Sequence, residues 1–334
     1  MARRLRVLAR RADLRRHERD PTQHRRRARA GSAAMRFQPT ADQQLFARTV
    51  RELLEKECPP EAARAGFSGE RWAKLREMGM IDMLASGMTE IDLVPILEEA
   101  GRAALPEPLI EAALIAGGAL DGVVTAAVGS RFVAHADVAD VIVIERDGAL
   151  YSVRREAVTL QPVETIDAAR PVFLITGGLE SGTVLEADRD LADNRATLGA
   201  AAELLGLASR SIEMAADYAK ERHQFGKPIG SFQAVKHKLA DALLHVEFAR
   251  PVVYRAAWSL SQRDETIERD VSMAKAMAGD AAAGAAKAAL QTLGAIGYTQ
   301  EHDLHVWMKR IWALNAAWGN PDQHRARVAS AVIA

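Results

Sequence analysis

The sequence has a single cysteine and no long apolar segment. Cys58 stands alone among 334 residues, which excludes a disulfide framework within the chain and a metal centre built from several cysteines. No run of about 20 apolar residues is free of charged residues, so the sequence predicts no membrane-spanning helix. We therefore expect a soluble, cytoplasmic protein without a metal site, long enough to form two or three domains.

Charge is balanced over the whole chain but unevenly distributed along it. Residues 1–34 contain twelve Arg and three acidic residues, a net charge of +9, so the other 300 residues carry −9. An acidic body argues against nucleic acid as the main partner. The basic segment has no apolar run long enough for a signal peptide, and a transit peptide or a nucleic-acid-binding arm stays open. We favour the simpler interpretation that Met35 is the true start and that 1–34 is a disordered extension.

The remaining sequence shows three successive patterns. Residues 35–122 have the periodicity of amphipathic helices, whereas residues 123–188 alternate short β-branched runs with the turn pair Asp147–Gly148, which predicts antiparallel strands. Residues 189–334 are rich in Ala and Leu and predict four long helices. These helices are expected at residues 190–222, 231–261, 265–293 and 303–332. The sequence thus predicts a mainly α protein with an N-terminal helical domain, a small β domain and a C-terminal four-helix bundle.

The connection between the first two bundle helices has an unusual composition. It reads ERHQFGKPIGSFQ over residues 221–233. Gly226 and Gly230 allow a tight reversal of the backbone, and Ser231 is expected to cap the second helix. The simplest interpretation is a capped turn between helices in which Arg222 forms a salt bridge.

The same connection also suits a nucleotide ligand. The planar guanidinium of Arg222 matches a pyrophosphate, and the side chain of Phe225 can cover a flat ring system. The side-chain amides of Gln224 and Gln233 can hydrogen-bond to a ribose or a base. Spacing alone leaves this interpretation and the capped turn equally open.

Two stretches resemble motifs of the acyl-CoA dehydrogenase family. The stretch YAKERHQFGKPIGSFQAVKHKLAD, residues 218–241, resembles the signature of that family. The stretch QTLGAIGYTQEHDLHVWMKR, residues 291–310, is similar to the family's later motif. The resemblance covers about residues 38–330 and includes the helical–β–helical order of the family. It is strong in the C-terminal bundle and weak in the β region.

The resemblance implies that this chain binds FAD across a subunit interface. In the family's later motif, a Gln and a pair of Gly residues meet the flavin dinucleotide of the neighbouring subunit. Ala295 stands where the family usually has the second Gly, which is a mild departure. The residues that match the family's FAD contacts are Arg222, Gln224, Phe225, Gln233, Gln291, Leu293 and Gly294.

The catalytic carboxylate of the family is absent from both of its usual positions. Desaturation of an acyl thioester needs a carboxylate to remove the α-proton while the β-hydrogen leaves as hydride to flavin N5. Family members carry this Glu before the Gly that follows the last motif, or before an Arg early in the first bundle helix. Those positions hold Trp318 and Asn194, so we predict no catalytic residue in this chain. Glu203, Glu213 and Glu301 are other carboxylates that could act as a displaced base.

The loops that hold the flavin ring in the family are also missing. They are similar to TEPxxGSD and WITN, and neither occurs between residues 120 and 188, a region too short for the family's usual β domain. We therefore predict the non-catalytic subunit of an α2β2 acyl-CoA dehydrogenase, whose partner subunit supplies the Glu and the isoalloxazine pocket. Short family members of this kind resemble the paired dehydrogenases of actinobacterial steroid breakdown. That resemblance implies a steroid-derived CoA thioester as substrate and an acceptor like electron-transfer flavoprotein.

Two alternatives stay open. The chain could be a catalytically inactive homo-oligomer that binds acyl-CoA or acts as a scaffold. Co-purification of a second chain with yellow colour would distinguish this alternative from a heteromeric enzyme. The chain could also be a self-sufficient dehydrogenase with Glu203 or Glu301 as base, which flavin content and turnover of the chain alone would decide.

Overall fold

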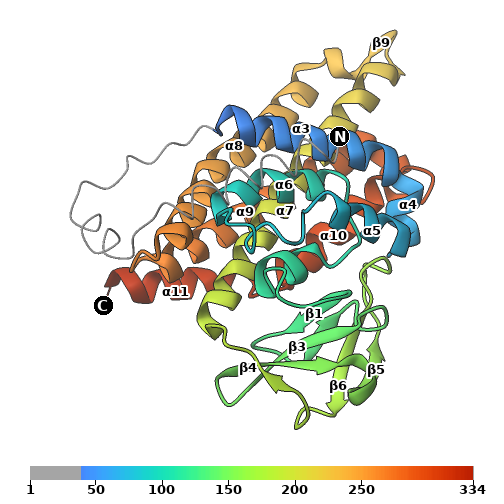
Figure 1. Cartoon of the computed structure of the whole chain (residues 1–334). Helices are drawn as coiled ribbons and strands as arrows, with labels where there is room; N and C mark the ends of the chain where they lie inside the picture. The colour runs from blue at the N-terminus through green and yellow to red at the C-terminus, as the bar shows by residue number, and fades with distance from the viewer. Residues whose placement is uncertain (1–38, 334) are drawn as a thin grey trace.

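The computed structural model describes residues 39–333, so the basic segment 1–34 and the expected start at Met35 lie outside the described residues. Helices form the main body of the described chain, and most of the strands form a separate lobe on one side of it (Figure 1). This arrangement confirms the predicted fold class, mainly α with a small β region between two helical regions. The division into separate domains at residues 122/123 and 188/189 stays a prediction.

The N-terminal region of the described chain is helical. It contains α3 (Ala41–Glu57), α4 (Pro60–Ala65), α5 (Gly69–Glu77), α6 (Glu90–Arg102) and the π turn η1 (Glu111–Ile115). Thr40 and Gln43 form a capping box at the start of α3, in which the Thr40 hydroxyl accepts a hydrogen bond of 3.2 Å from the backbone N–H of Gln43. Phe46, Val50 and Leu54, spaced by four residues, are buried along one side of this helix.

The β region of the described chain forms two small sheets. The first has the strand order β1 (Val124–Ala127), β3 (Val141–Arg146), β4 (Ala149–Arg154) and β7 (Thr183–Val184). The second has the order β2 (Phe132–Ala134), β6 (Val172–Gly177) and β5 (Thr159–Val163). The expected turn at Asp147–Gly148 is confirmed, since both residues have positive φ, 51° and 77°, as a two-residue hairpin between β3 and β4 favours.

One strand pair departs from the expected antiparallel arrangement. β1 and β3 run parallel, with Val124 opposite Val141. β2 lies between them in the sequence but belongs to the other sheet, so the chain leaves the first sheet and re-enters it in the same direction. A sequence pattern marks strands but not their partners, which is why this pairing was not predicted.

The C-terminal region contains the three longest helices of the described chain and two shorter ones. They are α7 (Arg189–Glu221), α8 (Gln233–Gln262), α9 (Ile267–Leu293), α10 (Leu304–Ala316) and α11 (Pro321–Ile333). A hairpin of β8 (His223–Gln224) and β9 (Lys227–Pro228), followed by the 3₁₀ turn η3 (Ile229–Ser231), joins α7 to α8. A second 3₁₀ turn, η4 (Gly294–Tyr298), follows α9.

Two expectations for this region are wrong. The predicted fourth helix is split into α10 and α11, because Trp318 and Gly319 adopt left-handed backbone conformations with φ of 58° and 91°, through which a right-handed helix cannot continue. Ser231 does not cap α8. Its hydroxyl donates a hydrogen bond of 2.7 Å to the carbonyl of Pro228 in the preceding turn, and Phe232 separates it from the first helical residue.

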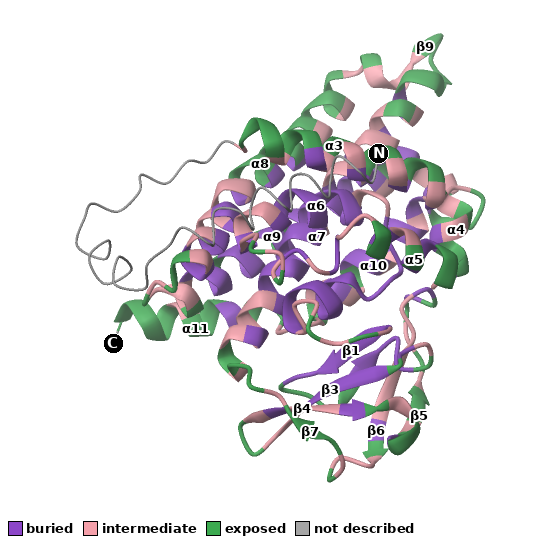
Figure 2. Ribbon diagram, viewed as in Figure 1, coloured by how far each residue is buried: buried purple, intermediate pink, exposed green. Residues whose placement is uncertain are grey.

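Two glycines allow α6 and α7 to approach each other closely. A Cβ on Gly101 would lie 2.1 Å from the carbonyl oxygen of Glu203, and a Cβ on Gly206 would lie 1.9 Å from that of Glu98. Both helices belong to the buried centre of the helical body, which is purple in Figure 2. This crossing brings Glu203 against the N-terminal helical region, where its side chain is removed from solvent.

Candidate functional site

The hairpin between α7 and α8 projects from the helical body. Both helices extend beyond their neighbours and carry β8 and β9 at the far end (Figure 1). Phe225 and Gly226 form the turn with φ of 54° and 78°, a conformation that is uncommon for Phe. The side chain of Phe225 is 91% exposed, and its ring meets that of Phe232 edge-on with centroids 6.2 Å apart. An exposed aromatic ring on an unfavourable backbone conformation indicates a binding surface.

An open groove lies beside this hairpin. It has a volume of about 390 Å³ and combines the end of α7, the hairpin and the end of α9. Its lining residues are Tyr218, Arg222, Gln224, Ile229, Thr292, Leu293, Ala295 and Ile296. The structure therefore brings together Arg222, Gln224 and Leu293, which belong to the predicted cofactor residues of both motifs.

The other predicted cofactor residues lie around the groove rather than in its lining. Phe225 and Gly294 each directly follow a lining residue. Gln233 and Gln291 are exposed on the first turn of α8 and the last turn of α9. Gly294 has a φ of 67°, and a Cβ there would meet no atom within 4 Å, so the backbone conformation rather than lack of space favours glycine.

Sequence reasoning missed Tyr218, Ile229, Thr292 and Ile296 in the lining of this groove. Tyr218 precedes Arg222 by one helical turn, so the spacing alone would have placed both on one side of α7. Thr292 and Ile296 lie inside the second motif, Thr292 in the last turn of α9 and Ile296 in the 3₁₀ turn that follows it. For Ile229, the sequence gives no indication of a place in the groove beyond an apolar side chain.

The groove fits a ligand with an anionic centre and a polar, partly flat remainder. Within the described residues, the exposed side chain of Arg222 forms no hydrogen bond or ion pair, so the salt bridge of the simpler interpretation is not seen there. Its planar guanidinium is thus free to bind an anion with two parallel hydrogen bonds. Leu293 and Ile229 supply apolar surface, and the amide of Gln224 can donate and accept. These residues fit the diphosphate and ribose portions of a dinucleotide such as FAD.

Neither position at which the family carries its carboxylate holds a proton acceptor. The amide of Asn194 donates a hydrogen bond of 2.8 Å to the carbonyl of Asp190 on its own helix, at an open groove of about 620 Å³. The carbonyl of Trp318 accepts a hydrogen bond of 2.9 Å from Nε2 of His324. Burial lowers the pKa of His324 to about 4, so this ring is neutral near pH 7. Amide and indole groups cannot take the α-proton of a thioester near that pH.

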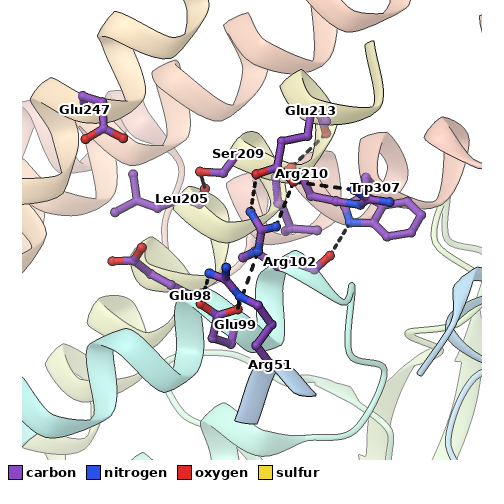
Figure 3. Close-up of polar contacts among 12 residues, drawn as sticks. Arg51, Glu98, Glu99, Arg102, Leu205, Ser209, Arg210, Glu213, Glu247 and Trp307 are labelled. Carbon is purple, nitrogen blue, oxygen red and sulfur yellow. Dashed lines mark hydrogen bonds and ion pairs between the residues drawn. The ribbon is translucent and has the colours of Figure 1, made fainter. Parts of the chain in front are cut away.

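Glu213, one candidate for a displaced base, belongs to a network of ion pairs between helices. Arg102 donates hydrogen bonds of 2.7 and 2.8 Å to its two carboxylate oxygens, and Arg51 binds Glu99 beside them (Figure 3). Burial raises the pKa of Glu213, but the hydrogen bonds and charge of Arg102 outweigh this and lower it below its usual value. The indole N–H of Trp307 donates to the carbonyl of Arg102 at 2.9 Å. The network around Arg102, to which Glu213 belongs, thus connects α3, α6, α7 and α10.

The other two candidates lie in opposite environments. Glu301 is exposed in the loop before α10, where its carboxylate has no hydrogen-bond partner within the described residues. Glu203 is buried, and burial is the main reason that its pKa rises to about 8. The cavity beside Glu203 has room for about one water molecule, far less than an acyl thioester needs.

Metal sites and membrane spans are not found in the part of the chain that the structure describes. Between residues 39 and 333, no group of three or more His, Cys, Asp or Glu side chains is placed to hold a metal ion. In the same range, each helix is too short or too polar to cross a membrane.

Comparison with known sequences places both motifs in one family. A sequence model described as acyl-CoA dehydrogenase, C-terminal domain, matches residues 186–333. Acyl-CoA dehydrogenase IpdE2 of Mycolicibacterium smegmatis is 32% identical over 319 residues, which cover 87% of this chain and 99% of the relative. Acyl-CoA dehydrogenase FadE34 of Mycobacterium tuberculosis is 32% identical over 276 residues, which cover 73% of this chain and 38% of that longer protein.

Solved structures share the fold. A chain of the ChsE4–ChsE5 complex from Mycobacterium tuberculosis superposes with a TM-score of 0.77 at 23% identity, covering 90% of this chain and 99% of that one. A Tcur3481–Tcur3483 steroid ACAD variant superposes with a TM-score of 0.75 at 20% identity, covering 87% of this chain and 98% of that one. These two likenesses concern the fold, whereas the identity to IpdE2 extends over nearly all of that relative. The chain therefore belongs to the acyl-CoA dehydrogenase family.

Proposed function

We propose that this chain is the non-catalytic subunit of a heteromeric, FAD-dependent acyl-CoA dehydrogenase. The observation that carries the proposal is an asymmetry within one chain. The groove beside the hairpin presents the guanidinium of Arg222, unpaired among residues 39–333, together with Gln224 and Leu293, whereas Asn194 and Trp318 replace the family's carboxylate. The chain thus has residues that suit the dinucleotide but no carboxylate at either of the family's two positions for the base.

The residues of the groove would bind the dinucleotide part of a cofactor whose flavin ring lies in the partner subunit. FAD, when bound, supplies the hydride acceptor of the desaturation. Arg222 would bind the diphosphate, Gln224 a ribose or base, and the exposed ring of Phe225 would cover a flat part of the ligand. Gln233, Gln291 and Gly294 would complete these contacts at the ends of α8 and α9. The partner subunit would supply the catalytic Glu and the pocket for the flavin ring.

The names of similar proteins support a partner and a substrate class. Two structures with this fold, ChsE4–ChsE5 and Tcur3481–Tcur3483, are described as pairs of different chains, and the second as a steroid ACAD. We therefore propose an α2β2 assembly that desaturates a steroid-derived CoA thioester and passes electrons to an acceptor like electron-transfer flavoprotein. A cytoplasmic location belongs to the same proposal.

Two other functions remain as competing proposals. A homo-oligomeric scaffold that binds acyl-CoA is favoured by the lack of a carboxylate at residues 194 and 318. A self-sufficient dehydrogenase would need Glu203 or Glu301 as base. The small cavity around Glu203 and the solvent-exposed loop of Glu301 both disfavour that role.

Co-expression tests the proposed function. The chain is produced with each full-length acyl-CoA dehydrogenase encoded next to it and, as a control, alone. We expect a stable complex that retains FAD and whose flavin is reduced by a steroid-derived acyl-CoA under anaerobic conditions, while the chain alone stays colourless. Changing the partner's Glu to Gln should slow reduction by about 10²-fold or more. Retention of FAD and substrate-dependent reduction by the chain alone would contradict the proposal.

A further inference from the structure

A small polar cavity lies where the two helical regions and the β region meet. It is lined by residues from the end of the N-terminal region, from two loops of the β region, from α7 and from α10. These residues are Leu105, Glu107, Ile110, Glu111, His135, Arg170, Glu203, Arg310 and Leu314. Six of these nine side chains are ionisable, in an interior position where such groups are rare.

Three of these groups lack a hydrogen-bond partner among the described residues. Nδ1 of His135, a side chain on a residue that is 3% exposed, has none, and neither does Nη2 of Arg310, which is 2% exposed. The carboxyl group of the buried Glu203 also forms no hydrogen bond or ion pair within the described residues. Since buried polar groups in proteins are almost always hydrogen-bonded, this cavity requires a further polar partner.

Each of the other charged groups in the lining pairs with an oppositely charged side chain. Nε of Arg310 donates to the carboxylate of Asp167, and Nη1 donates to the carbonyl of Leu105 at 2.6 Å. Arg170 lies 3.6 Å from the carboxylate of Glu111. Glu107 binds Arg71, with 2.7 Å between oxygen and nitrogen. Glu203 is therefore the one carboxyl group of this lining without a cation of its own among the described residues.

Two of the three groups without a partner are uncharged near pH 7. Burial raises the pKa of Glu203 to about 8, with a smaller contribution from Glu111, and outweighs the opposing charges of Arg310 and Arg170, so its carboxyl group is protonated. Burial also lowers the pKa of His135 well below its usual value, so this imidazole is uncharged. A cavity with room for about one water molecule and three unsatisfied polar groups suits a single ordered water, which typically makes about three hydrogen bonds.

We propose that this cavity binds one ordered water that bridges Nη2 of Arg310, Nδ1 of His135 and the protonated carboxyl of Glu203, and that the bridged centre is a proton-dependent latch between the β region and the bundle. In this arrangement the Arg310 N–H donates to the water, and the water donates to Nδ1 of His135. The third hydrogen bond joins the water to Glu203. No covalent step is involved.

The latch is placed to hold two loops of the β region. His135 follows β2 with a φ of 58°, and its backbone N–H donates to the carbonyl of Pro171 at 2.8 Å. Asp167, the partner of Arg310, also accepts from the backbone N–H of Ala169 at 3.2 Å. Segments 132–138 and 165–171 are thus joined to each other, and the pair of Asp167 with Arg310 attaches them to α10 beside Glu203 of α7.

Loss of the proton from Glu203 should open the latch. The new negative charge would be buried away from water and would face Glu111. The charges of Arg310 and Arg170 favour it, but burial outweighs them, and each of these guanidinium groups already pairs with another carboxylate. Because the pKa of Glu203 is raised in the fold, its stabilising contribution is complete below the usual value of 4.5 and is lost as the pH rises through about 8. The attachment of the β region should therefore weaken as the pH rises toward about 8, with little further change above it, whether or not the chain works as a dehydrogenase subunit.

Hydrogen exchange of the full chain at pH 6 and pH 9 tests the latch. After correction for intrinsic exchange, protection of segments 132–138 and 165–171 should fall by roughly a hundredfold in the wild type, because about two of these three pH units lie below the raised pKa of about 8 and above the usual value of 4.5. Glu203→Gln, which cannot ionise, should show no such fall. The control is Glu213→Gln on the same helix, which should behave like the wild type because the pKa of Glu213 is lowered rather than raised.

Two results would overturn the proposal. The first is the same pH dependence of these segments in the wild type and in Glu203→Gln. The second comes from a crystal structure of the full chain at pH 6. We expect one water within hydrogen-bonding distance of both Nη2 of Arg310 and Nδ1 of His135, whereas a cavity filled by side chains would show that no water site exists.

Discussion

The buried ammonium group of Lys275 on α9 donates a hydrogen bond of 2.9 Å to the backbone carbonyl of Gly319. A second hydrogen bond of 3.1 Å reaches the carbonyl of Asn315 at the end of α10. These two carbonyls flank Trp318, which holds one of the family's positions for the catalytic Glu. Burial lowers the pKa of Lys275 to about 7. The buried side chain of Lys275 thus fixes the turn in which Trp318 replaces the family's Glu.

Lys275→Met should remove a pH dependence of stability. Because the pKa of Lys275 is lowered in the fold, its stabilising contribution is complete above the usual value of 10.5 and is lost as the pH falls through about 7. The free energy of unfolding of the wild type relative to Lys275→Met should therefore rise from pH 7 to pH 10, by up to about 1.4 kcal/mol per pH unit. Urea unfolding at several pH values measures this difference. Lys287→Met, an exposed position on the same helix, should show a flat difference.

Gly206→Ala should strongly destabilise the fold. The added Cβ would lie 1.9 Å from the carbonyl oxygen of Glu98, and backbone atoms of α6 and α7 would have to move apart. We expect a loss of about 3 kcal/mol or more in the free energy of unfolding, at the upper end of overpacking costs. Gly284→Ala on α9, where a Cβ meets no atom within 4 Å, should instead stabilise the chain by up to about 1 kcal/mol. Equal effects of the two changes would contradict the close crossing.

Arg222→Ala should weaken FAD retention in the proposed complex. Loss of a charge-assisted hydrogen bond to a diphosphate costs about 1.5–3 kcal/mol, or roughly ten- to a hundredfold in affinity. Arg222→Lys should be intermediate, since an ammonium cannot make two parallel hydrogen bonds. Release of FAD after dilution, followed by its fluorescence, gives the measurement. Arg210→Ala is the control on the same helix, and unchanged retention in Arg222→Ala would assign Arg222 a structural role.

Asn194→Ala should have little effect on the chemical step of the complex. The side chain hydrogen-bonds to its own helix and cannot accept the α-proton. Trp318→Ala should lower stability through lost packing, by less than the about 3–5 kcal/mol of a fully buried aromatic residue, without removing flavin reduction. Single-turnover reduction of flavin by acyl-CoA in each variant complex separates the two effects. If Glu203→Gln or Glu301→Gln stops reduction while the complex stays folded and loaded with FAD, the base lies in this chain.

Local sequence signals predicted the parts of the fold that depend on neighbouring residues. The helical and β regions follow from periodicity, and the hairpin at Asp147–Gly148 follows from residues that tolerate positive φ. The two motifs predicted Arg222 and Leu293 as cofactor residues, and the structure places both in one groove. Their role in binding FAD stays a prediction. Ser231 shows the limit of such reasoning, because a suitable capping residue bonded to the preceding turn instead.

Tertiary structure alone decided which of these residues meet and which charges are buried. The parallel pairing of β1 with β3 arises because the intervening strand joins another sheet, and no local pattern records that choice. Glu203 and Lys275 look like ordinary charged residues of helices in the sequence. They lose contact with water only because neighbouring helices pack against them, for α7 through the close approach at Gly101 and Gly206. Burial then changes their pKa values, since the free energy of a charge depends on its surroundings in space and not on its neighbours in the chain.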